Sequence, residues 1–141
     1  MRAFSAAVGT LPAGIRGVLL SLPESVAKRI TEVRLRSGLP VVLVSGASSS
    51  FVMPSGRVTS IYSENALHAS PKDISEALGA FCGYSVHSCQ ESINRGFITI
   101  DGGHRVGVCG TAVTADEKVI SVRDISCLNL RIARRFEGCS G

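Results

Sequence analysis

The glycine-rich stretch at residues 101–113, DGGHRVGVCGTAV, limits the possible fold more than any other part of the sequence. Gly102 and Gly107 stand five apart, as the two fixed glycines of a phosphate-binding P-loop do. The Lys and the Ser or Thr that should follow are absent, because Val108 and Cys109 occupy those places. A P-loop is also followed by a helix, whereas apolar and polar residues alternate through the rest of this stretch. The pattern predicts a strand entered through a Gly-Gly turn, and this segment is not expected to bind nucleotide by itself.

Alternation of apolar and polar residues predicts further strands along the chain. In ITEVRLR, the apolar residues Val33 and Leu35 fall on one side, and the charged residues fall on the other. Gly107 and Gly110 inside a predicted strand indicate a bulge or a close approach of another backbone. The predicted strands are residues 30–36, 41–46, 97–100, 104–113, 118–123 and 127–133, with a hairpin-like pair in residues 48–62 that bends at Pro54, Ser55 and Gly56.

Helices are predicted in two regions. Apolar residues recur at helical spacing within residues 11–22, and Thr10 is the expected cap of that helix. A second helix is predicted after Ser70, because a proline follows it and Asp73 stands at the third helical position. A shorter helix follows a capping-box sequence and is expected to stop at Gly96.

The order of these elements is helix, strands, helices, strands, with connections of hairpin length. It predicts an α+β fold in which N-terminal helices and a central helical pair pack on a largely antiparallel sheet. We expect an N-terminal helical segment at residues 1–29 and an α+β domain at residues 30–141. Hydrophobic residues make up 45% of the chain, which is enough for one packed core. Since no stretch is long enough to span a membrane, we expect a soluble protein.

The five cysteines, at positions 82, 89, 109, 127 and 139, form no CxxC pair. An odd number without paired spacing predicts reduced thiols in the cytoplasm. A zinc site from Cys82, His87 and Cys89 is conceivable, but the close ligand pairs that structural zinc prefers are absent. We therefore expect these cysteines to act as small buried hydrophobic residues.

Basic residues are spaced along the predicted strands of the C-terminal half. In CLNLRIARR, the apolar residues fall on one face, and Asn129 and Arg131 fall on the other. Arg123 precedes that strand, and His104 and Arg105 begin the long strand before it. If these strands are neighbours, a stripe of guanidinium groups crosses one sheet face, where it suits phosphate and carboxylate oxygens. An ordinary solvated sheet face is the alternative interpretation.

Three segments, EVRLRSGLP, RGFITIDGGHRVGVCGTAV and VISVRDISCLNLRIAR, in this order, resemble the N-terminal domain of the stage III sporulation protein AA family. The resemblance covers nearly the whole chain and is most specific at residues 102–105 and 123–131. One departure is visible at residues 38–40, because the family usually reads Gly-Arg-Pro where this chain has Gly-Leu-Pro.

The resemblance implies that the chain is the accessory N-terminal domain of a sporulation ATPase, similar to the RecA-like motors of secretion systems and pili. Such an ATPase powers the channel complex between mother cell and forespore. ATP and Mg²⁺ belong to a C-terminal Walker A domain, and this chain contains no G-x-x-x-x-G-K-[ST], so we expect no cofactor and no hydrolysis here. The implied partners are that ATPase domain, neighbouring subunits of a ring, and channel membrane proteins. The implied location is the mother-cell cytoplasm, peripheral to the membrane that faces the forespore.

In related secretion motors the N-terminal domain closes over the ATPase core and offers arginines to the bound nucleotide. An arginine near developing phosphate charge stabilises that charge electrostatically. The resemblance therefore implies a nucleotide or interface contact, and the residues expected there are Arg105, Arg123, Arg131, His104 and Asn129.

Two other functions stay open. The net charge of +4, and an Arg-Gly-Phe run at residues 95–97 that is similar to an RNA-recognition signature, favour a nucleic-acid-binding module. That signature needs a second aromatic residue where Thr99 stands, so nucleic acid is not an expected partner. A small-molecule sensor domain is the other alternative, and it needs an enclosed apolar pocket with convergent polar groups.

Overall fold

A computed structural model describes residues 2–46, 48–82, 90–100, 103–115 and 118–132. The helices are α1 (Arg2–Val8), α2 (Ala13–Leu20), α3 (Glu24–Ala27), α4 (Pro71–Phe81) and α5 (Gln90–Arg95). The strands are β1 (Glu32–Arg36), β2 (Leu39–Pro40), β3 (Val42–Ser45), β4 (Ser48–Val52), β5 (Val58–Thr59), β6 (His68–Ala69), β7 (Phe97–Ile100), β8 (His104–Ala115) and β9 (Lys118–Arg131). A large antiparallel sheet with helices packed on it confirms the predicted α+β fold.

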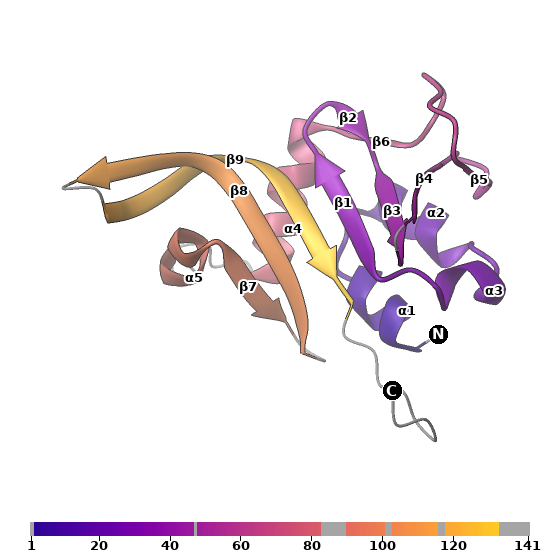
Figure 1. The fold of residues 1–141 in the computed structure, drawn as a ribbon, viewed down its shortest axis with the longest axis horizontal. Helices are drawn as coiled ribbons and strands as arrows, with labels where there is room; N and C mark the ends of the chain where they lie inside the picture. The colour runs from indigo at the N-terminus through magenta and orange to yellow at the C-terminus, as the bar shows by residue number, and fades with distance from the viewer. Residues whose placement is uncertain (1, 47, 83–89, 101–102, 116–117, 133–141) are drawn as a thin grey trace.

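The large sheet brings together strands from distant parts of the sequence. Its order is β5-β4-β3-β1-β9-β8-β7, and each neighbouring pair is antiparallel. The last strand, β9, therefore lies inside the sheet, between β1 and β8 (Figure 1). The short strands β2 and β6 form a separate pair.

Alternation predicts the strands of the large sheet well, except at β9, and it predicts neither β2 nor β6. Val33 and Leu35 of β1 are fully buried, as the pattern of that strand indicates. The predicted strands at residues 118–123 and 127–133 are parts of one strand, because β9 runs without a break from Lys118 to Arg131 and pairs with β8 along its length. The register between the two strands shifts after Cys109, so the irregularity predicted at Gly110 is confirmed.

The second predicted helix begins as expected, whereas the N-terminal region differs. The hydroxyl of Ser70 accepts the Asp73 N–H at 3.1 Å, and the Asp73 carboxylate accepts the Ser70 N–H at 2.9 Å, which completes a capping box for α4. The spacing does not predict α1, and Thr10 does not cap α2. Pro12 occupies the N-cap instead, and the Thr10 hydroxyl donates to the carbonyl of Ala7 at 3.5 Å.

The helices cover one face of the large sheet. Figure 1 shows α4 behind β9 and β1, with the opposite face of the sheet toward the viewer. One cluster of buried side chains joins Phe4 and Ile15 of the helices to Leu35 and Leu130 of the strands. The boundary at residue 30 stays a prediction, although residues on both sides of it contribute to this core. None of the described helices is long and apolar enough to cross a membrane.

Candidate interaction surface

The open face of the sheet gathers arginines from three strands, and we call it the arginine face. Glu32 of β1 lies opposite Arg131 of β9, and Arg131 lies opposite Arg105 of β8. Side chains directly opposite each other in paired strands lie on the same side of a sheet. The members of the arginine face are Glu32, Arg34 and Arg36 from β1, Phe97 and Thr99 from β7, Arg105, Gly107 and Cys109 from β8, and Cys127, Asn129 and Arg131 from β9.

A buried carboxylate organises the centre of this face. The side chain of Glu32 is 10% exposed, and it accepts from Arg34 Nε at 2.6 Å and from Arg131 Nε at 3.2 Å. Within the described part of the chain, neither guanidinium group makes another hydrogen bond or ion pair. Because both contacts use Nε, each guanidinium group keeps its terminal N–H donors for a further acceptor.

A hollow of about 370 Å³ adjoins this group. Its lining residues are Thr31, Glu32, Arg34, Val44, Arg131 and Ile132. The side chain of Arg131 is 74% exposed, whereas that of Arg34 is 39% exposed. An anionic group that enters the hollow therefore meets guanidinium donors from two strands, the arrangement that carboxylate and phosphate oxygens favour.

Arg105 is held over an aromatic ring. Its guanidinium carbon lies 4.8 Å from the centre of the Phe97 ring, within cation–π distance. Gly107, which stands opposite Phe97, has no side chain, so the Arg105 side chain can extend across that position. Among the described residues, Arg105 makes no ion pair.

The structure brings together part of the predicted site. Arg105 and Arg131 lie directly opposite each other, and Asn129 is the next residue of the same face along β9. Arg123 also lies on β9, beyond the register shift, and its side chain is outside the described residues. His104 is 2% exposed and lies on the helix-covered side of the sheet, so it does not join the arginines.

The contribution of β1 was not visible from the sequence. Alternation places Arg34 and Arg36 on the polar side of that strand, but no local signal pairs β1 with β9. Arg131 lies 99 residues beyond the carboxylate that it contacts, Glu32. The alternating apolar residues predict that each of these two segments is a half-buried strand. Only the sheet order shows that the two strands are neighbours.

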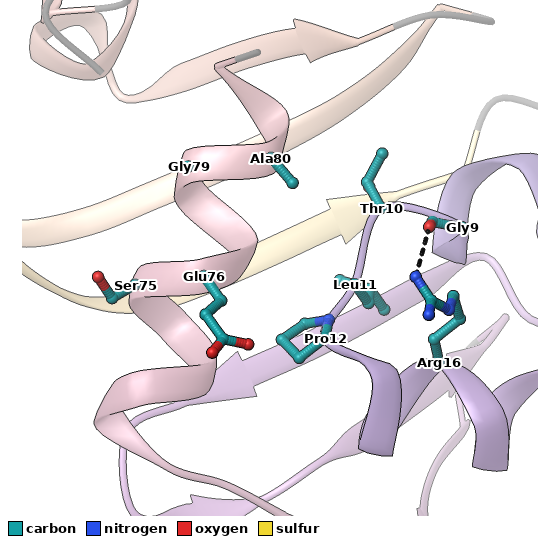
Figure 2. Close-up of a pocket in the computed structure, with 9 residues that line it drawn as sticks. All are labelled: Gly9, Thr10, Leu11, Pro12, Arg16, Ser75, Glu76, Gly79 and Ala80. Carbon is teal, nitrogen blue, oxygen red and sulfur yellow. Dashed lines mark hydrogen bonds between the residues drawn. The ribbon is translucent and has the colours of Figure 1, made fainter. Parts of the chain in front are cut away.

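A second concavity, of about 620 Å³, lies between the α1–α2 connection and α4 (Figure 2). Figure 2 shows Glu76 extending from α4 toward Pro12. On the other side of the cleft, Arg16 donates to the carbonyl of Gly9 at 3.4 Å. Because charged side chains border this open cleft, it lacks the enclosed apolar lining that a small-molecule sensor needs.

Neither surface has the donors of a metal site. Across the described ranges, no three His, Cys, Asp or Glu side chains gather to hold a metal ion. Cys82 is 8% exposed, as expected of a small hydrophobic residue, while His87 and Cys89 lie outside the described residues. The expectation of buried cysteines is wrong for Cys109, which is exposed on the open face of the sheet, and Cys127 is only partly buried. Guanidinium groups suit the oxygens of phosphate and carboxylate groups, so the arginine face has the donors to bind an anionic group.

The chain therefore forms a domain of the α+β class, an antiparallel sheet with helices packed on one face. The sequence model of the family described as sporulation stage III, protein AA matches residues 6–141, and the chain belongs to this family. It is 31% identical, over 128 residues, to stage III sporulation protein AA of Bacillus subtilis (strain 168). The matched region is 91% of this chain and 38% of that protein, so the chain spans less than half of the curated relative's length. No solved structure matches the chain.

Proposed function

We propose that this chain is the accessory N-terminal domain of a sporulation ATPase, and that its arginine face contacts the ATPase core or the nucleotide bound there. The observation that carries the proposal is the position of Arg105 and Arg131, which lie directly opposite each other on the uncovered side of the sheet. Membership of the sporulation stage III, protein AA family supports the part of the proposal that concerns sporulation. The greater length of the Bacillus subtilis relative leaves room for a catalytic domain beyond the matched region.

The chemistry of the contact follows from the arginines themselves. A guanidinium group stays charged at any physiological pH and binds phosphate or carboxylate oxygens through two parallel N–H groups. At a closed interface, from which water is excluded, such a group stabilises the charge that develops on a transferring phosphoryl group. The domain would then assist hydrolysis in trans while its own residues carry out no bond-breaking step.

The proposal places the domain in the mother cell, at the channel complex that joins mother cell to forespore. Its partners there are its own C-terminal ATPase domain, neighbouring subunits of a ring, and membrane proteins of the channel. The charge of the arginine face supports a partner that presents acidic groups or bound phosphates.

The proposal has a direct test in the parent protein. A G-x-x-x-x-G-K-[ST] motif is expected in the parent gene after residue 141, and its absence would remove the proposal. Arg105, Arg123 and Arg131 are then each replaced by Ala in the full-length ATPase, and kcat and KM for ATP are measured. Loss of a contact to developing phosphate charge lowers kcat/KM by about tenfold or more.

Arg57→Ala is the matched control for these variants. Arg57 is an exposed arginine before β5, at the opposite edge of the sheet from β7 and β8, so its replacement should leave ATPase activity unchanged. Thermal unfolding of each variant separates loss of activity from loss of fold, which matters most for Arg131 because it contacts a buried carboxylate. Wild-type kinetics in all three arginine variants would contradict the proposed contact.

Nucleic acid is the second candidate for the same face, because an exposed phenylalanine stands among the arginines. Phe97 is 36% exposed on the arginine face. However, the guanidinium group of Arg105 already covers its ring, and Thr99 occupies the place of a second stacking residue. Binding of a labelled oligonucleotide that weakens steeply with salt would favour this candidate over the ATPase interface.

A further inference from the structure

Two cysteines of the arginine face lie directly opposite each other. Cys109 of β8 pairs with Cys127 of β9, at the last regular position before the register shift. Both are free thiols, Cys109 exposed and Cys127 partly exposed. Their spacing in the sequence suggests no pairing, and only the register of the two long strands brings them together.

The backbone geometry suits a bond between the two sulfur atoms. The Ser37 N–H donates to the Ser126 carbonyl at 2.8 Å, so Ser126 directs its backbone groups toward β1, and Cys127 directs its own toward β8. Cys109 and Cys127 therefore form the hydrogen-bonded type of antiparallel pair, whose Cα atoms lie about 5.5 Å apart. Disulfides span Cα distances of about 4.4–6.8 Å. The typical spacing of such a pair lies within that range, and both side chains are on the same side of the sheet.

The surroundings distinguish the two thiols. Burial raises the pKa of Cys127 above its ordinary value of 9.0, and the neighbouring Cys109 adds to that rise, while Arg36 and Arg34 oppose it. The Cys127 thiol donates to the side-chain carbonyl of Asn129 at 3.5 Å. Because Cys109 is the more exposed of the two, a small reagent in solution meets its sulfur first.

We propose that Cys109 and Cys127 form a reversible thiol–disulfide site that exchanges with small-molecule disulfides. The thiolate of Cys109 attacks one sulfur of the small disulfide, whose S–S bond breaks and releases a thiolate. The thiolate of Cys127 then attacks the Cys109 sulfur of the mixed disulfide, and the second small thiolate leaves. Two protein thiols are oxidised to one disulfide, and the small disulfide is reduced to two thiols, which take up the two protons. The same steps in reverse restore the dithiol.

The cross-link would join β8 to β9 beside the irregularity at Gly110. It would fix the relative position of the two strands that carry Arg105 and Arg131. Transient disulfides of this kind are the form that disulfide chemistry usually takes in the cytoplasm. The site is independent of the proposed ATPase contact, since it requires only the two cysteines.

The test uses the intact chain in mixtures of oxidised and reduced glutathione, followed by alkylation and mass spectrometry of the peptides. The expected result is a peptide pair linked through Cys109 and Cys127, with loss of both thiols to alkylation, and return of both on addition of excess reduced glutathione. In Cys127→Ser, Cys109 should instead keep a glutathione adduct, because the resolving thiol is gone.

Cys82→Ser is the control, since Cys82 is buried on the helix-covered side and should not affect the link. Far-ultraviolet circular dichroism verifies that each serine variant is folded. Three outcomes would overturn the proposal: both thiols stay open to alkylation, both carry stable glutathione adducts, or each forms its disulfide with a different cysteine.

Discussion

At the scale of single residues, the carboxylate of Glu32 links two strands through charge. It lies between Arg34 of its own strand and Arg131 of β9, and its side chain is nearly buried while both arginines reach solvent. Hydrogen bonds that involve charged groups contribute more than neutral ones, although exposure of the arginines reduces the gain. Glu32 also offsets part of the positive charge of the arginine face, so its removal should affect both stability and binding.

Glu32→Gln should lower the free energy of unfolding by about 1–2 kcal/mol, because a neutral amide cannot replace two charge-assisted hydrogen bonds. Urea denaturation of the isolated chain measures the change. Glu76→Gln is the matched control, because Glu76 is exposed and its ion pair with Lys72 on α4 is long, at 3.9 Å, so a change near zero is expected. If the two variants lose equal stability, Glu32 does not organise the face.

At the scale of helices and strands, the sequence predicts the end of an element correctly where neighbouring residues alone determine that end. Ser70 and Asp73 cap α4 as predicted, because a capping box involves only neighbouring residues. Thr10 fails as a cap because Pro12, two residues later, takes the N-cap position of α2. Gly96 ends α5 with a φ of +96°, a conformation that glycine adopts without strain.

Ser70→Ala should lower the free energy of unfolding by about 1 kcal/mol, because the first turn of α4 loses the acceptor of the Asp73 N–H. Ser75→Ala, at an exposed position within the same helix, is the control and should be neutral or slightly stabilising, since Ala is the better helix former. Thermal unfolding of both variants gives the comparison. If Ser70→Ala lowers the unfolding temperature no more than Ser75→Ala does, the cap contributes nothing to stability.

At the scale of the whole molecule, the order of strands could not be predicted from the sequence. Alternation gives each strand two faces, but any of several strand orders would bury the same apolar residues. The pairing of β9 with β1 decides that Glu32 and Arg34 join Arg131, and it depends on packing between distant segments. The resemblance to a family pointed to Arg105 and Arg131, yet only the sheet order shows that they share one open face with β1.

The two faces of the large sheet contribute differently. The covered face carries the core side chains, whereas the arginine face is expected to contribute little to stability. Leu130 lies on the covered side, 1% exposed, opposite Val33 of β1 and Val106 of β8. Leu130→Ala should therefore lower the free energy of unfolding by about 2–5 kcal/mol, because it leaves a cavity between three strands and the helices.

On the arginine face, Thr99→Val keeps the branched shape of an exposed strand residue and should change stability by no more than about 0.5 kcal/mol. Chemical denaturation of both variants measures the contrast with Leu130→Ala. If Leu130→Ala is tolerated as well as Thr99→Val, the side called covered is not the core. If Thr99→Val is as damaging as Leu130→Ala, the arginine face is itself part of the core and is not free to bind a partner.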